Sequence, residues 1–215
     1  TRSYSVTGVQ TCALQIYRIL LTSHIRPDGD AIGCVVAMRQ TLRALGKNVQ
    51  PILLDPAPPR YDLLVEPEPI PVLGRDITTA DLADVDAILI LDTCSNAQLE
   101  PIAPFIREHV GTLKIALDHH ATRDPIADIT HVDEHAAAAT LLVWSWIQTM
   151  NWPLDDQVAT ALFVGMATDC GWFRFANTSP DLMAACTELL DHGVRIDRVH
   201  QRLYQSEIGR AACRE

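Results

Sequence analysis

Short apolar runs alternate along this chain with longer segments whose apolar residues recur at helical spacing. The strand-like runs cover residues 18–22, 49–54, 87–92, 113–117 and 126–131, and the helix-like segments cover residues 31–45, 136–150, 154–168 and 180–192. Strands that alternate with helices are typical of βαβ units, whose strands pair in parallel. We therefore predict an α/β fold in which a mostly parallel sheet is flanked by helices.

Carboxylates and imidazoles stand where the predicted strands end. They are His24, Asp28 and Asp30 after the first strand, Asp92 at the end of the third, Asp118, His119 and His120 after the fourth, and Asp169 at the end of a helix-like segment. Ligands of parallel sheets collect beyond the carboxyl ends of the strands, where successive loops meet. We predict that most of these side chains share one edge of the sheet, and that Asp30 also caps the helix that follows it.

Four segments that contain these carboxylates and imidazoles follow one another along the chain in a characteristic order. They read SHIRPDGDAIG from Ser23, DT from Asp92, LDHHA from Leu117 and TDCGWFRF from Thr168. Together they resemble the four motifs of the DHH phosphoesterases, a RecJ-like superfamily. The resemblance is to the small bacterial branch that degrades very short oligoribonucleotides and dephosphorylates 3'-phosphoadenosine 5'-phosphate. It extends from about residue 17 to residue 206.

The resemblance implies a site for two divalent cations. Carboxylates and imidazoles without thiolates suit Mn²⁺, with Mg²⁺ or Zn²⁺ as alternatives. By resemblance, one ion would be held by His24, Asp28 and Asp92, and the other by Asp30, Asp92, His119 and Asp169. Asp92 would thus bridge the two ions, and such a pair can activate water and stabilise both oxygens of a phosphoryl transfer.

Four further residues receive candidate roles close to the metals. The resemblance implies that His120 contacts the scissile phosphate or assists the leaving oxygen, and we expect Asp118 to orient a ligating imidazole. Arg174 could pair with a substrate phosphate, or it could face solvent from an alternating strand. Trp172 could stack on a base or belong to the apolar core.

Composition narrows the classes of partner. The 215 residues are 48% hydrophobic, which suffices for one sizeable core, and the formal net charge is −10. This charge argues against stable binding to long nucleic acid, because such binding depends mainly on Lys and Arg side chains that neutralise phosphates. It favours a short oligoribonucleotide or a nucleoside bisphosphate as the partner. No apolar run approaches the roughly 20 residues of a membrane helix, so we expect no membrane partner. We keep a homodimer as an alternative to the monomer.

The cysteines of the body suggest a reduced compartment. Cys34, Cys94, Cys170 and Cys186 show no Cys-x-x-Cys spacing, and we expect buried, unpaired thiols in a cytoplasmic protein. Cys34 and Cys170 stand where the resembled family has a small hydroxyl residue.

The two ends of the chain differ in character from the body. Residues 1–16 and 207–215 look like translated sequencing adapters, and we exclude both from the predicted domain, residues 17–206. Neither end is expected to pack. In the resembled family a second, substrate-gripping domain with a Gly-Gly-His motif follows, and we expect the native protein to contain it although the sequence here does not.

Three alternative functions use the same ligand pattern. A cyclic or linear dinucleotide phosphodiesterase of the same superfamily would carry sensor or membrane segments. A manganese inorganic pyrophosphatase would fit the segment from Gly171 to Phe175 less well. A fragment that binds metal or nucleotide without turnover would differ from all of these in an activity assay.

Overall fold

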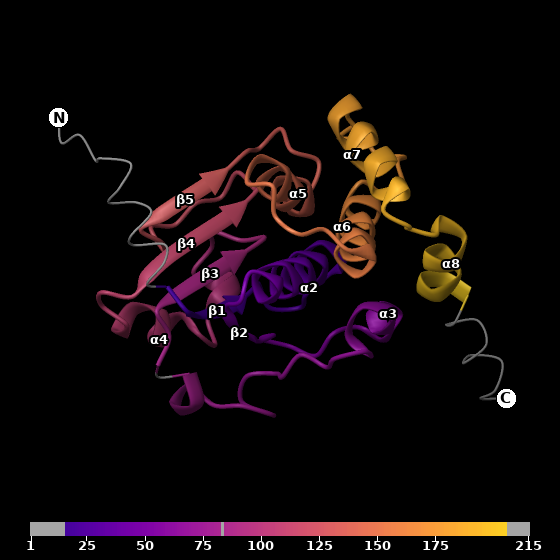
Figure 1. The fold of residues 1–215 in the computed structure, drawn as a ribbon. Coiled ribbons are helices and arrows are strands. Elements are labelled where there is room, and N and C mark those ends of the chain that lie inside the picture. Colours follow the sequence, from indigo (N-terminus) through magenta and orange to yellow (C-terminus); the bar gives the residue numbers. More distant parts are fainter. Residues whose placement is uncertain (1–15, 83, 206–215) are drawn as a thin grey trace, which may run out of the picture.

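A five-stranded, all-parallel sheet forms the centre of the computed structural model, which describes residues 16–82 and 84–205 (Figure 1). The strands are β1 (Arg18–Thr22), β2 (Asn48–Pro51), β3 (Ala87–Leu91), β4 (Leu113–Asp118) and β5 (Ile129–Val132), and their spatial order is β2-β1-β3-β4-β5. Each neighbouring pair is parallel. The predicted α/β fold with a parallel sheet is confirmed.

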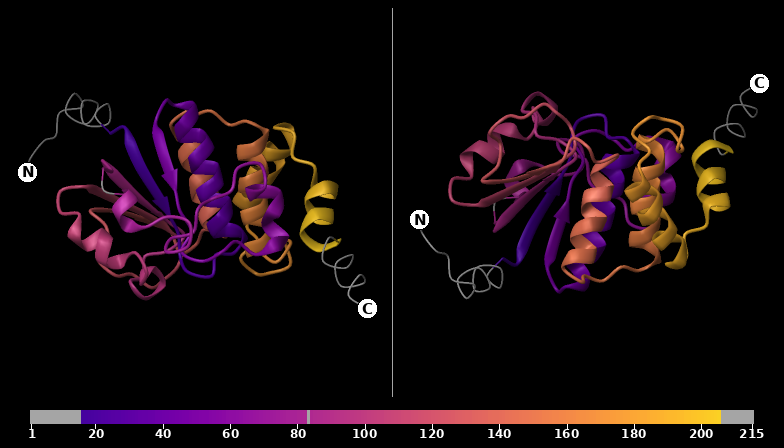
Figure 2. Two further views of the ribbon diagram at one scale, coloured as in Figure 1. Left: turned by 90° about the horizontal axis from the view of Figure 1, so that it is seen from below. Right: turned by 90° about the horizontal axis from the view of Figure 1, so that it is seen from above.

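Helices cover both faces of this sheet (Figure 2). They are α2 (Gly29–Ala44), α3 (Asp62–Val65), α4 (Ala103–Glu108), α5 (Ala139–Thr149), α6 (Asp156–Asp169), α7 (Pro180–Asp191) and α8 (Ile196–His200), which continues as a π-helical turn, η4 (Gln201–Gln205). Short 3₁₀ turns, η1 (Pro59–Tyr61), η2 (Thr79–Leu82) and η3 (Ala97–Leu99), lie between them. Helices α2 and α5 pack on one face, α6 packs against both of them on the side away from the sheet, and α4 packs on the other face.

Alternate residues of the central strands enter two separate cores. In β3, Leu89 and Leu91 pack with the side chains of α2, α5 and α6, whereas Ile88 and Ile90 pack with those of α4. All five residues of β3 are buried. A strand covered on both faces reads as a continuous apolar run, which is why these strands show no polar alternation in the sequence.

Two glycines let α2 and α6 approach closely. A Cβ on Gly33 would lie 2.6 Å from the Ala161 carbonyl oxygen, and one on Gly165 would lie 2.4 Å from the Thr140 Cγ2 atom and 2.8 Å from Asp30 Oδ1. No real Cβ fits at these distances, so only glycine permits this crossing. The crossing brings the first turn of α2 beside the start of α5.

The first helix begins earlier than predicted, which changes its cap. Helix α2 starts at Gly29, and Asp28 is the N-cap: its Oδ1 accepts hydrogen bonds from the backbone N–H groups of Asp30 (3.0 Å) and Ala31 (3.1 Å). The prediction that Asp30 caps this helix is therefore wrong. Because Asp30 lies in the first turn, its side chain is left free for another partner.

Four cysteines of the described chain, Cys34, Cys94, Cys170 and Cys186, are buried and unpaired, as predicted. None of the helices in the described ranges is long and apolar enough to cross a membrane. The predicted adapter-derived segments, residues 1–16 and 207–215, lie outside the described residues except for Ile16, which packs against the larger core.

Candidate metal centre

The carboxyl ends of β1, β3 and β4 bring two histidines to opposite oxygens of one aspartate. The Nε2 atom of His24 lies 3.4 Å from Asp92 Oδ2, and the Nε2 atom of His119 lies 3.5 Å from Asp92 Oδ1. Strands β1 and β3 are neighbours, and the chain extends the sheet in opposite directions from β1. This is the topological switch point, where open parallel sheets bind their ligands.

The remaining carboxylates complete two sets of side chains around Asp92. His24, Asp28 and Asp92 place their ligand atoms within 4.8 Å of one another, and so do Asp30, His119 and Asp169. In the second set, His119 Nε2 is 3.7 Å from Asp30 Oδ2 and 3.9 Å from Asp169 Oδ2. The structure thus brings together all six residues for which the sequence predicted metal binding.

Backbone groups fix the orientation of both imidazoles. The Nδ1 atom of His24 is 2.7 Å from the Ile25 carbonyl oxygen, and the Nδ1 atom of His119 is 3.2 Å from the Ala136 carbonyl oxygen. With Nδ1–H donating to a carbonyl, each Nε2 keeps a lone pair that faces carboxylate oxygens. Such an arrangement suits a cation between the two groups, because an imidazole lone pair and the oxygens of an ionised carboxylate would then both face it.

Asp30 is held by a part of the chain that sequence reasoning did not single out. Its Oδ2 accepts a hydrogen bond from the backbone N–H of Ala139 (2.5 Å), and its Oδ1 accepts from the backbone N–H (2.9 Å) and hydroxyl (2.5 Å) of Thr140. These are the first residues of α5, where N–H groups are unpaired and the helix dipole favours an anion. The sequence pattern did not indicate this role, because the predicted helix began at residue 136 and placed Thr140 beyond its first turn, whereas α5 begins at Ala139.

Asp92 has an unusual backbone conformation. Its φ is 61°, in the left-handed region. This conformation costs about 1–2 kcal/mol for a residue with a Cβ, although Asp and Asn adopt it more readily than most. The turn directs the Asp92 carboxylate back over the end of the sheet, between the two histidines.

Electrostatics make the site unfavourable without cations. Burial, and then the nearby carboxylates Asp30 and Asp28, raise the pKa of Asp92 well above its usual value. Burial raises the pKa of Asp30, and burial followed by repulsion from Asp30 raises the pKa of Asp169 to about 6. The buried atoms Asp92 Oδ1 and His119 Nε2 have no hydrogen-bond partner among the described residues. A divalent cation would satisfy both atoms and neutralise the crowded carboxylates.

Asp118 forms an ion pair with His120. Asp118 is fully buried, and its Oδ1 accepts hydrogen bonds from His120 Nδ1 (2.7 Å) and from the backbone N–H of His119 (2.8 Å). This side-chain bond raises the pKa of His120 to about 9. Burial alone would raise the pKa of Asp118, but the bonds from His120 lower it overall. Asp118 orients the His120 imidazole, whose ring lies within reach of Asp92 and His119, while the His119 ring is held by the Ala136 carbonyl oxygen. The expectation that Asp118 orients a ligating imidazole stays a prediction.

The metal-free protein should lose stability as pH rises from 6.5 to 9. His120 titrates near 9 in the folded state and at about 6.5 in an unfolded chain, so the folded state holds the extra proton across this range. Stability from the Asp118–His120 pair is complete below pH 6.5 and disappears as pH passes 9. Melting curves recorded with a chelator should show the decline, and His120→Asn should flatten it. An equal decline in that variant would assign the effect to other groups.

Arg174 and Trp172 lie on the turn that follows α6. Residues 170–177 form turns and bends, so Arg174 does not lie on a strand, although its side chain faces solvent as that alternative expected. Arg174 is exposed, and its Nε donates a 2.7 Å hydrogen bond to the Gly171 carbonyl oxygen. It makes no hydrogen bond or ion pair with the two metal-binding sets. The Trp172 indole packs against rings of the chain itself.

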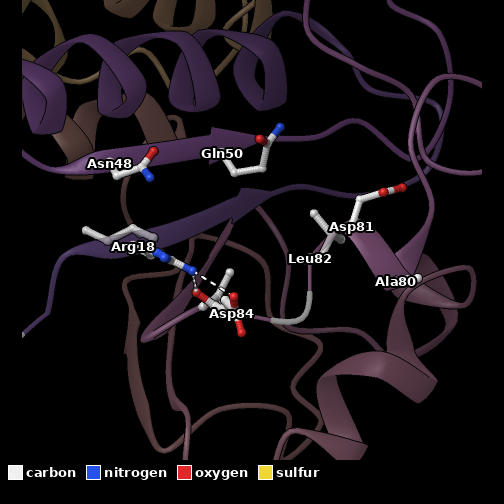
Figure 3. Close-up of a pocket in the computed structure, with 9 residues that line it drawn as sticks. Arg18, Asn48, Gln50, Ala80, Asp81, Leu82 and Asp84 are labelled. Carbon is white, nitrogen blue, oxygen red and sulfur yellow. Dashed lines mark hydrogen bonds and ion pairs between the residues drawn. The ribbon is translucent and has the colours of Figure 1, made fainter.

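A separate pocket lies at the opposite ends of the strands. It is lined by Arg18 and Asn48, the first residues of β1 and β2, and by residues around η2 (Figure 3). Arg18 forms a 3.0 Å ion pair with Asp84 there. This pocket contains neither of the metal-binding sets, so it is distinct from the candidate metal centre.

Two known proteins are similar to this chain over most of its own length. The chain is 29% identical over 190 residues to the bifunctional oligoribonuclease and PAP phosphatase NrnA of Thermus thermophilus, covering 86% of this chain and 53% of that protein. It is 24% identical to the Bacillus subtilis protein of the same name, covering 88% of this chain and 58% of the relative. It therefore spans little more than half the length of these relatives.

A solved structure shares the fold. The exopolyphosphatase-related protein from Bacteroides fragilis superimposes with a TM-score of 0.85 at 22% identity, over 93% of this chain and 59% of that protein. The model of the DHH family's N-terminal domain matches residues 18–166, which include both histidines that face Asp92. The chain belongs to the DHH family, as an example of its N-terminal domain.

Proposed function

We propose that this chain is the metal-binding half of a phosphoesterase that acts on short oligoribonucleotides, on 3'-phosphoadenosine 5'-phosphate, or on both. The observation that carries the proposal is the position of Asp92. Its two oxygens face His24 and His119 at 3.4 Å and 3.5 Å, so one carboxylate serves two adjacent sets of side chains. The names of the two relatives support this choice of substrates.

Each set would hold one divalent cation, for which Mn²⁺ fits the ligand chemistry best and Mg²⁺ or Zn²⁺ are alternatives. His24, Asp28 and Asp92 would bind one ion, and Asp30, Asp92, His119 and Asp169 the other. Two adjacent ions supply, when bound, the positive charge that activates water and stabilises a transferring phosphoryl group. The buried carboxylates also explain part of the net charge of −10, which bound cations would reduce locally.

His120 would act on the substrate and not on the metals. Its side chain is half exposed, its Nδ1 is engaged by Asp118, and the resulting positive charge is suited to a phosphate oxygen. The opposite nitrogen, Nε2, could then donate a proton to the leaving oxygen. Arg174, exposed on the turn after Asp169, would provide a second cationic contact to a substrate phosphate.

Replacing His120 by Ala should lower the rate while leaving Mn²⁺ binding nearly intact. Loss of a proton donor costs typically 10²–10⁴-fold in rate. Calorimetric titration with Mn²⁺, paired with a rate measurement on a dinucleotide, separates the two effects. Because His120 Nδ1 lies 3.8 Å from Asp92 Oδ1, a large loss of bound Mn²⁺ would instead identify His120 as a ligand.

A substrate panel tests the proposed function. The chain should be incubated with Mn²⁺ and with dinucleotides, 3'-phosphoadenosine 5'-phosphate, cyclic dinucleotides, pyrophosphate and long single-stranded DNA. We expect the first two substrates to react fastest. Faster hydrolysis of pyrophosphate or of cyclic dinucleotides would replace the proposal with one of those activities. Binding of Mn²⁺ without turnover of any substrate would leave a metal-binding module.

A further inference from the structure

The turn that follows Asp169 has a left-handed backbone at three successive residues. Helix α6 ends at Asp169, and Gly171, Trp172 and Phe173 have φ values of 58°, 56° and 62°. Gly171 forms the usual end of a helix: its N–H donates to the Thr168 carbonyl oxygen, and the N–H of Trp172 donates to the Ala167 carbonyl oxygen. The next two residues carry side chains, for which this conformation is unfavourable. A hydrogen bond within the turn, from the Phe173 N–H to Cys170 Sγ (3.2 Å), holds part of it, and contacts of the Trp172 side chain beyond the turn add to this restraint.

The Trp172 side chain provides such contacts. Its Nε1 donates a 2.6 Å hydrogen bond to the Tyr204 hydroxyl, and its ring meets the rings of His200 and Tyr204 edge to face at centroid distances of 5.0 Å and 5.8 Å. On the other side it meets Phe163 of α6 at 6.3 Å. The indole thus joins the end of α6 to the segment formed by α8 and η4, which Figure 1 places beyond α6, away from the sheet.

The α8–η4 segment is itself attached to a second part of the molecule. Arg202 of η4 forms an ion pair with Glu66, the residue that follows α3. Tyr204 is therefore presented by a segment with contacts on two sides. The Trp172 side chain belongs to the turn at residues 171–173 and packs against this segment. Its contacts with the segment can therefore restrain the turn.

Asp169 is the residue that such a restraint would affect. Its carboxylate reaches His119 from the last position of α6, where no further helical turn holds it. Repulsion from Asp30 opposes this position when no cation is present. We propose that Trp172 is a positioning residue, whose docking onto Tyr204 and His200 fixes the end of α6 and thereby sets the affinity of the cation site that includes Asp169.

This inference rests on the proposed metal centre, and Mn²⁺ titration by calorimetry tests both. Asp169→Asn first identifies which of the two binding steps depends on Asp169. Trp172→Phe and Tyr204→Phe each remove the indole–hydroxyl hydrogen bond and keep an aromatic ring. Both should weaken that same step by about tenfold, as loss of an outer-shell partner does, and should leave the other step within about twofold. The double variant should lose no more than either single one, because both remove one bond.

Trp146→Phe is the matched control. Trp146 also donates an indole hydrogen bond to a ring, Nδ1 of His131 at 2.9 Å, but it lies two helical turns from the end of α5 that holds Asp30. This variant should change neither binding step. Unchanged Mn²⁺ affinity in Trp172→Phe and Tyr204→Phe, or an equal loss in Trp146→Phe, would overturn the positioning role, even if the melting temperature falls. Failure of the unaltered chain to bind Mn²⁺ would overturn the metal centre as well.

Discussion

Asp92→Asn should abolish the binding of both cations and, with it, phosphoester hydrolysis. Each Asp92 oxygen faces a different histidine, so this substitution removes charge from both sets of ligands at once. We expect Mn²⁺ affinity to fall by more than about a hundredfold, the upper end of the loss caused by removing an outer-shell partner. Calorimetric titration with Mn²⁺ measures it directly.

The same substitution should stabilise the metal-free protein. Asp92 is buried, and its pKa is raised by burial and by repulsion from Asp30 and Asp28, so its ionised form disfavours folding. Asn is neutral and similar in shape, and it tolerates the left-handed backbone of this position. With a chelator present, the variant should therefore melt at a higher temperature than the parent, and addition of Mn²⁺ should raise only the melting temperature of the parent.

Asp28→Asn provides the matched comparison. Asp28 belongs to only one set of ligands, and Asn is as good an N-cap as Asp, so helix α2 should persist. This variant should retain one Mn²⁺ binding step and some activity at saturating Mn²⁺. Equal losses in Asp28→Asn and Asp92→Asn would contradict the bridging role of Asp92.

The sequence predicted the edge of the sheet at which the site lies because strand ends can be read from apolar runs. His24, Asp92 and His119 each follow a buried strand, and parallel strands end at one edge. The placement of Asp169 needed more than this pattern. It is the last residue of helix α6, and the close packing of α2 against α6, which glycine permits, helps to bring it to the same edge.

The sequence could not predict which neighbours hold each carboxylate. Asp28 and Asp30 are separated only by Gly29, and the N-cap role falls to Asp28 and not to Asp30 because the helix begins two residues earlier than its apolar pattern indicates. The partner of Asp30 is the start of α5, more than a hundred residues further along the chain. Hydrogen bonds between such distant residues depend on tertiary packing, which local patterns do not contain.

Joining this chain to the remainder of a longer relative should raise its activity on oligonucleotides. The chain spans 53% of the Thermus thermophilus relative. The resemblance described above leads us to expect a second domain that grips the substrate. Positioning of a substrate can supply roughly 7–11 kcal/mol of a barrier. A fusion of residues 16–205 to the unmatched part of that relative should therefore hydrolyse dinucleotides at least about a hundredfold faster than the chain alone, which requires only ~2.7 kcal/mol.

A small diester such as bis(p-nitrophenyl) phosphate distinguishes positioning from a general gain in folding or metal loading. It has few groups for a second domain to contact, so its rate should change far less on fusion than the rate on dinucleotides. Mn²⁺ affinity should also be similar in the two proteins, because both sets of ligands lie within residues 24–169. If the chain alone already hydrolyses dinucleotides as fast as the fusion, this domain contains everything that the reaction needs. Substrate positioning must then come from its own residues, and His120 and Arg174 are the first to examine.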